Sequence, residues 1–191
     1  MAIAVTNALT TKGPRETLYQ DQLTRFKNGI KFDSQKEYIE RWGSKSGGFG
    51  EDLVKEVMDK NIMTKRQYTR IPRSNGRYYI ADGFIPSINV YLESKFLSFN
   101  TAGTAPEKLP YFLFKAEEYD RPVVLVLGGE HELLKDEPSR LLWNAFNDPT
   151  NCPSKAAIAV VNAVGDRIAG IVKLSELREW VKQKEATLAT R

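Results

Sequence analysis

The hydrophobic residues of this chain recur with the period of a helix in some segments and with the period of a strand in others. The helical period predicts helices over 15–28, 34–42, 50–61, 104–116, 137–146 and 175–185. Two-residue alternation and short apolar runs predict strands over 67–72, 78–84, 89–96, 122–127 and 156–163. Helices and strands therefore alternate along the chain. This order favours an α/β fold with a mixed central sheet of about five strands, flanked by helices on both faces.

Three charged residues stand in the neighbouring strands predicted over 78–84 and 89–96. Because strand side chains alternate between two faces, Glu93 and Lys95 lie on the same face of the second strand. In a tight hairpin, Asp82 of the first strand comes close to both. Burying charge costs free energy unless the charge is paired or binds a metal. The cluster is therefore either a Mg²⁺ site, in which the lysine serves a bound water, or an edge hairpin with a solvated Glu–Lys pair.

The arrangement of Asp82 followed by Glu93-Ser94-Lys95 resembles the signature of the PD-(D/E)XK nuclease superfamily, with Ala81 in place of the proline of the motif name. The resemblance spans roughly residues 48–128 and includes the order of the predicted elements, namely a helix, three strands, a helix and a strand. It implies a restriction-endonuclease-like αβββαβ core. It also implies that Asp82 and Glu93 ligate Mg²⁺, for which Mn²⁺ can substitute, and that Lys95 serves the attacking water.

A further carboxylate belongs to the helix predicted over 50–61. Many nucleases of this superfamily carry a glutamate on the helix before the first strand, where it reaches the metal site, and Glu51 matches that position. The resemblance therefore adds Glu51 to the expected metal ligands and catalytic residues. The alternative is a capping charge, because the helix dipole favours a carboxylate in the first turn.

A run of uncompensated positive charge precedes the hairpin, in a chain whose net charge is +4. Its basic residues are Lys65, Arg66, Arg70, Arg73 and Arg77, with no acidic residue among them. Such charge is what contacts with DNA phosphates require, although it also protects a solvated edge strand. Arg73 lies nearest the predicted turn and is the candidate for reading a base, whereas Arg70 and Arg77 are expected on phosphates. Lys108 is either a further phosphate contact or an ordinary surface charge.

Composition excludes several other kinds of site. Cys152 is the only cysteine and His131 the only histidine, so the chain has no disulfide framework, no zinc cluster and no multi-histidine metal site. His131 stands between two glutamates and is interpreted as a surface residue, with an acid–base role as the alternative. The glycine-rich link at 43–48 matches neither common phosphate-binding loop motif, so no nucleotide cofactor is expected.

The composition and hydropathy of the chain also bear on its domain organisation and its cellular location. Residues 1–14 are small and polar and are expected to form a flexible N-terminal arm without the features of a signal peptide. Residues 15–191 are expected to form a single nuclease domain with its core at about 48–128. No apolar run approaches the roughly 18 residues of a membrane span. We therefore expect no membrane partner and a cytoplasmic setting, and the resemblance implies a prokaryote or phage.

The function expected from the sequence is Mg²⁺-dependent hydrolysis of double-stranded DNA, by a sequence-specific type II restriction endonuclease acting as a homodimer. One catalytic site per chain would need two copies to cut both strands. The alternatives are a structure-selective or repair nuclease, a homing endonuclease of the same fold, or a non-catalytic DNA-binding protein that keeps the fold.

Overall fold

The computed structural model describes residues 13–29, 46–64, 71–72, 76, 78–97 and 108–190. Its centre is a mixed five-stranded sheet in the order β1-β4-β5-β6-β7. These strands are β1 (Met63–Thr64), β4 (Gly83–Ile85), β5 (Val90–Leu97), β6 (Val123–Gly129) and β7 (Ile168–Lys173). β4 pairs antiparallel with both β1 and β5, whereas β5, β6 and β7 run parallel. The expected α/β class, with a mixed sheet flanked by helices, is confirmed.

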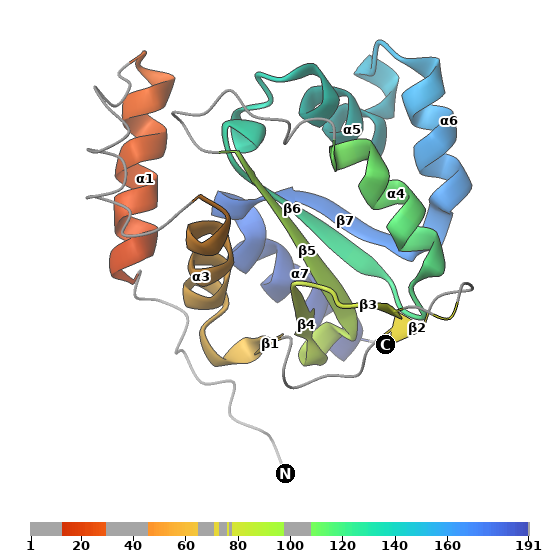
Figure 1. Ribbon diagram of the computed structural model, residues 1–191, viewed down its shortest axis with the longest axis horizontal. Helices are drawn as coiled ribbons and strands as arrows, with labels where there is room; N and C mark the ends of the chain where they lie inside the picture. Colours follow the sequence, from red (N-terminus) through yellow and green to blue (C-terminus); the bar gives the residue numbers. More distant parts are fainter. Residues whose placement is uncertain are drawn as a thin grey trace.

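Helices cover both faces of this sheet (Figure 1). One face carries α1 (Pro14–Lys27), α3 (Ser46–Met58) and α7 (Leu177–Ala189). The other carries α4 (Lys108–Glu118), α5 (Glu137–Asn147) and α6 (Lys155–Val164). We call the two hydrophobic cores that result the α3 core and the α4 core. Strand β6 serves both: Val124 and Val126 belong to the α3 core, while Leu125 and Leu127 belong to the α4 core, because strand side chains alternate.

The helical periodicity of the sequence is a reliable guide to most of the described helices. The segments predicted over 15–28, 50–61, 104–116, 137–146 and 175–185 correspond to α1, α3, α4, α5 and α7. In α3, Leu53 and Val57 are buried in the α3 core, and in α4, Leu109 and Phe112 are buried in the α4 core, as the helical period requires. The helix predicted over 34–42 lies outside the described residues, as does 101–107.

The strand predicted over 78–84 is divided in two. Its first part is β3 (Tyr78–Tyr79), which pairs with β2 (Ile71–Pro72) in a separate two-stranded sheet, and its last part is β4. The break falls at Asp82, whose side chain accepts a hydrogen bond from the backbone N–H of Ser94. A side chain thus occupies a place where a continued strand would offer a backbone carbonyl. The expected first strand over 67–72 is also wrong for the main sheet, because β1 takes that place.

The apolar segment 156–163 is the helix α6, not the predicted strand. Ser154 precedes the helix, and its Oγ accepts a hydrogen bond from the N–H of Ala157 at 3.1 Å, which caps the first turn. Val161 and Val164 are buried at helical spacing. A short apolar run does not distinguish a strand from a helix by composition alone. The fifth strand is instead β7, a segment that was not predicted to be a strand.

Short 3-10 helices connect the main elements. They are η1 (Asp59–Asn61), η2 (Pro86–Ile88), η3 (Glu130–Leu133), η4 (Pro149–Asn151), η5 (Gly165–Arg167) and η6 (Leu174–Glu176). η2 joins β4 to β5, and the turn is completed by Asn89 in the left-handed conformation with φ 55°. Among the helices described, none combines the length and the apolar character needed to cross a bilayer.

We expect the buried side chains that β6 contributes to the α4 core to make a large contribution to the free energy of unfolding. Leu125 is fully buried there, so Leu125→Ala should lower the free energy of unfolding by about 2–5 kcal/mol through lost burial and the cavity left behind. The matched control is Leu188→Ala on α7, where the side chain is exposed and the change should stay within about 0.5 kcal/mol. Urea unfolding of both variants measures this, and equal losses would contradict the assignment of the core.

Candidate functional site

The hairpin of β4 and β5 brings Asp82 beside Glu93. The register pairs Gly83 with Leu92, so Asp82, just before the first residue of β4, comes opposite Glu93. Asp82 Oδ2 accepts a hydrogen bond from the backbone N–H of Ser94 at 2.9 Å. The Asp82 carboxylate is therefore held on the backbone of β5, at the residue between Glu93 and Lys95.

Glu93 is the centre of the cluster and is almost fully buried, with 1% of the residue exposed. Lys95 Nζ lies 3.0 Å from Glu93 Oε2 and forms an ion pair with it. On the other carboxylate oxygen, Lys115 Nζ of α4 lies 2.7 Å away. Tyr119, just after α4, donates its hydroxyl to that same Oε1 at 2.6 Å. Both oxygens of Glu93 are thus engaged by donors, and the alternative of a solvated Glu–Lys pair is wrong for this buried carboxylate.

These contacts decide the charge state of Glu93. Burial alone would raise the pKa of its carboxyl group, because desolvation penalises the charged form. The positive charges of Lys95 and Lys115, together with the hydrogen bonds from Lys115 and Tyr119, outweigh that effect and lower the pKa below its usual value. Glu93 is therefore a carboxylate at neutral pH, which is the form that can ligate a cation.

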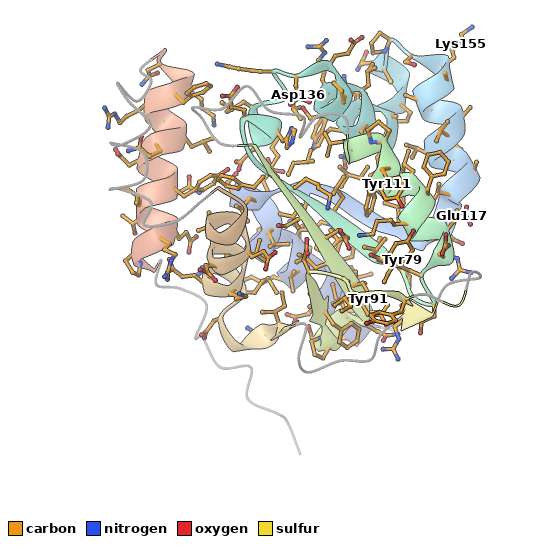
Figure 2. All side chains as sticks on the ribbon, in the orientation of Figure 1. Tyr79, Tyr91, Tyr111, Glu117, Asp136 and Lys155 are labelled. Atoms are coloured by element: carbon orange, nitrogen blue, oxygen red, sulfur yellow. The ribbon has the colours of Figure 1, made fainter. Side chains whose placement is uncertain are left out.

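Aromatic rings surround the Lys115 end of the cluster. The Tyr119 ring makes edge contacts with Tyr79 and Tyr91, at centroid distances of 5.7 and 5.6 Å. Lys115 Nζ lies 5.2 Å from the centre of the Tyr79 ring, within the range of a cation–π contact. Figure 2 shows Tyr79 and Tyr91 next to each other near the β2–β3 end of the molecule. The rings limit water around the ion pairs and so strengthen them.

Glu51 lies on α3, which covers the opposite face of the sheet. The neighbouring Gly50 packs tightly on β5: a Cβ added there would come within 2.8 Å of the Phe96 side chain. Glu51 is therefore near the same end of β5 as Lys95, and it is half-buried. It does not join Asp82 and Glu93 in a ready metal cage, since no three His, Cys, Asp or Glu side chains in the described ranges gather closely enough for that.

The basic residues expected on DNA are not part of the described site. Lys65, Arg66, Arg70, Arg73 and Arg77 lie outside the described residues. Lys108 is the first residue of α4, but its side chain is likewise outside the described part. Their roles stay predictions.

Sequence reasoning missed Lys115 and Tyr119. Tyr111 of the same helix is exposed to 52%, whereas Lys115, four residues later, reaches Glu93. The one available signal is that Lys115 and Tyr119 are four residues apart, the spacing that places two side chains on one face of a helix. The sequence does not state which residue of the sheet this end of α4 packs against.

His131 is not the surface residue that was expected. It is fully buried in η3, directly after β6. Its Nδ1 lies 2.9 Å from Asp136 Oδ2, and Asp136 also caps α5 by accepting from the N–H of Ser139 at 2.9 Å. His131 therefore fixes the connection between β6 and α5, well inside the fold. The neighbouring glutamates gave a misleading polar signal.

A second buried carboxyl group lies beyond the end of β6. Glu132 accepts hydrogen bonds from the hydroxyls of Tyr19 and Ser175, and the Tyr19 hydroxyl in turn accepts from the N–H of Gly129 at 3.0 Å. Burial raises the pKa of Glu132 above its ordinary value, and the hydrogen bonds only partly oppose it. This group links α1 to the ends of β6 and β7 and is separate from the Glu93 cluster.

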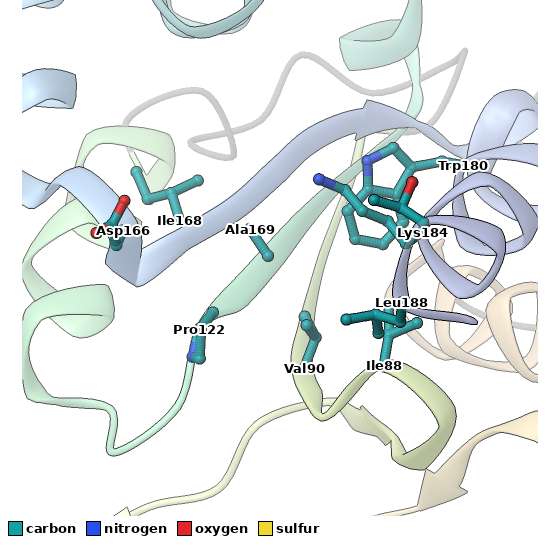
Figure 3. Close-up of a pocket in the computed structure, with 10 residues that line it drawn as sticks. Ile88, Val90, Pro122, Asp166, Ile168, Ala169, Trp180, Lys184 and Leu188 are labelled. Carbon is teal, nitrogen blue, oxygen red and sulfur yellow. The ribbon is translucent and has the colours of Figure 1, made fainter. Parts of the chain in front are cut away.

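A pocket of about 320 Å³ lies away from both carboxyl groups (Figure 3). Trp180, Lys184 and Leu188 of α7 line one side, and Ile88 and Val90 of the hairpin line the other. None of Asp82, Glu93 and Lys95 belongs to its lining. The pocket therefore does not contribute to the charged cluster.

Comparisons of the chain with protein families, with curated proteins and with solved structures gave no match. The chemistry of the site must therefore be argued from its own residues. Two carboxylates on adjacent strands supply oxygen ligands, which are the ligands Mg²⁺ prefers, and Mg²⁺ commonly takes one or two carboxylates with water and substrate phosphate completing the shell. Asp82 and Glu93 are therefore of the chemical type that could hold such an ion, once the donors on the Glu93 oxygens make room for it.

The raised pKa of Glu132 predicts a pH dependence of stability. A folded-state pKa above the unfolded value means that this contribution is fully present below the unfolded pKa and is lost as pH rises through the folded pKa. The unfolding free energy of Glu132→Gln should therefore improve relative to the wild type as pH rises above about 4.5, the ordinary value. The exposed Glu137→Gln is the control. The measurement is urea unfolding at a series of pH values. Unfolding free energies of wild type and Glu132→Gln that change in parallel with pH would contradict the raised pKa of Glu132.

Proposed function

We propose that this chain is a Mg²⁺-dependent endonuclease that hydrolyses DNA phosphodiester bonds on a restriction-endonuclease-like core. The single observation that carries the proposal is the position of the Asp82 carboxylate on the backbone N–H of Ser94, between the ion-paired residues Glu93 and Lys95. The order α3-β1-β4-β5-α4-β6 supports it: with the separate β2–β3 sheet left aside, this is the αβββαβ sequence of elements expected for that core. Burying an ionised carboxylate costs desolvation free energy, and a hairpin with a purely structural role could avoid that cost with an apolar residue at this position.

The residues divide the chemistry between them. Mg²⁺, or Mn²⁺ in its place, would be held by oxygens of Asp82 and Glu93 and would supply Lewis-acid polarisation of the phosphate and a more acidic bound water. Lys95, 3.0 Å from Glu93 Oε2, is positioned to hydrogen-bond the attacking water and to offset the charge that develops on the phosphate. Glu51 would hold a second ion or an outer-shell water.

The open side of β5 offers the substrate a way in. Strand β4 pairs with β5 only at Val90, Tyr91 and Leu92. From Glu93 onward the described part of the chain places no strand on that side, and the Asp82 carboxylate occupies the N–H of Ser94. A DNA backbone that approaches along this edge would bring its phosphate to Asp82 and Lys95.

Within nucleases, we propose a type II restriction endonuclease that acts as a homodimer on double-stranded DNA. Sequence recognition would then come from loops of the same domain, with Arg73 on a base edge and Lys65, Arg66, Arg70, Arg77 and Lys108 on phosphates. Digestion of one long DNA into discrete fragments supports restriction. Cleavage confined to branched substrates would instead identify a structure-selective nuclease.

One observation favours a non-catalytic DNA-binding protein as a second candidate. Glu93 already has two ammonium groups and a hydroxyl on its oxygens, so the network is complete without a metal. Tight binding of DNA, with no hydrolysis in Mg²⁺ or Mn²⁺, would select this candidate over the nuclease.

The first test of the proposal is cleavage of plasmid and phage DNA in Mg²⁺. We expect cleavage that EDTA abolishes. Asp82→Asn keeps an acceptor for the N–H of Ser94 but loses the negative charge, and we expect its rate to fall by about 100-fold or more, since even a group that merely supports a metal ligand is worth about 10–100-fold. Lys95→Gln should have a comparable effect, because a group that assists proton transfer contributes about 100-fold or more.

The control for this test is Asp166→Asn, which removes an exposed carboxylate on η5 and should cleave at the wild-type rate. Wild-type activity in Asp82→Asn and Lys95→Gln would show that the cluster is not the active site.

The basic segment gives a separate prediction about DNA binding, measured in Ca²⁺ across a salt series. Arg70→Ala and Arg77→Ala should bind all sequences more weakly and with a shallower salt dependence, because phosphate contacts release counterions. Arg73→Ala should lose about 1–3 kcal/mol at one base position, as expected for an arginine that reads guanine. An Arg73→Ala protein that binds every sequence as the wild type does, at every salt concentration, would show that this segment does not read DNA.

A further inference from the structure

The ion pair between Lys115 and Glu93 has no part in the nuclease chemistry proposed above. Its Nζ lies 2.7 Å from Glu93 Oε1, closer than Lys95 Nζ lies to Oε2 at 3.0 Å. The Lys115 side chain is exposed to only 16%. A carboxylate oxygen has about two lone-pair positions, and on Oε1 both are taken, by Lys115 and by the hydroxyl of Tyr119. In this state Oε1 has no position left for a cation.

We propose that Lys115 is a built-in counter-ion that competes with the divalent metal for Glu93, so that the metal binds only as the Lys115 ammonium leaves Oε1. The inference rests on the proposed function, since it concerns the same carboxylates. Without metal, the Lys115 ammonium group of the chain itself occupies the Glu93 oxygen that the metal would need.

Electrostatics gives the reason for the competition. Within the part of the chain that the structure describes, the two negative charges of Asp82 and Glu93 are matched by the two positive charges of Lys95 and Lys115. A dication placed among these groups would be repelled by both ammonium groups at short range, in surroundings where screening is weak. Lys95 is needed beside the reacting water. Lys115, on the far oxygen, is the cation that can be exchanged.

The surroundings of Lys115 allow it to move without losing all its contacts. Its Nζ lies 5.2 Å from the centre of the Tyr79 ring and 5.9 Å from that of Tyr119. The two rings can stabilise the ammonium group both while it is bonded to Oε1 and after it has moved off that oxygen. The ammonium group can therefore leave Oε1 and still keep a contact with these rings.

The test measures binding of Mn²⁺ alone by isothermal titration calorimetry, without DNA. Lys115→Met keeps the apolar stem of the side chain and removes the charge, and we expect the Kd for Mn²⁺ to fall by about tenfold, the scale on which groups around metal ligands act. Lys155→Met, at the exposed start of α6 (Figure 2), removes the same net charge far from the site and should leave the Kd unchanged.

A second variant guards against misfolding. Lys115→Gln removes the charge but retains an N–H donor for Oε1, and it should tighten Mn²⁺ binding in the same direction. A Kd equal to or weaker than that of the wild type in both Lys115 variants would overturn the inference, and so would the absence of Mn²⁺ binding in all proteins. Tighter binding in the variants, without any DNA cleavage by the wild type, would leave the inference standing and overturn the nuclease proposal instead.

Discussion

The burial of one carboxylate determines how this end of the molecule is built. Glu93 stands on the central strand β5 with 1% of the residue exposed, where an unpaired charge would cost several kcal/mol. Three donors offset that cost: Lys95 from the same strand, and Lys115 and Tyr119 from the end of α4. The phase of α4 on the sheet is therefore tied to the Glu93 side chain. The packing of the α4 core and the charge of the site depend on the same contacts.

Strand β5 has different tasks on its two faces. Val90 and Leu92 enter the α3 core, while Tyr91 and Glu93 face α4. Because β4 begins only at Gly83, the N–H of Ser94 on β5 bonds to the Asp82 carboxylate, and among the described residues no strand pairs with β5 on that side beyond Leu92. A well-packed core thus supports a charged edge.

The sequence was sufficient for those parts of the site that follow from local geometry. The two-residue period of a strand places Glu93 and Lys95 on one face, and the hairpin brings Asp82 to them. Lys115 and Tyr119 could not be assigned in advance, since their contact depends on how α4 is rotated against the sheet. The burial of His131 was hidden for a similar reason: its partner Asp136 lies across a turn. The segment 156–163 was mistaken for a strand because an apolar run of that length suits a helix equally well, and only the cap at Ser154 decides.

The most direct test of the account is a crystal structure of the protein soaked in Mn²⁺, with the ion located by its anomalous scattering. The account predicts one strong peak at coordination distance from oxygens of both Asp82 and Glu93, with Lys115 Nζ withdrawn from the position 2.7 Å from Oε1 that it holds without metal. A peak elsewhere, or an ion-free site in which Lys115 keeps that contact, would contradict it.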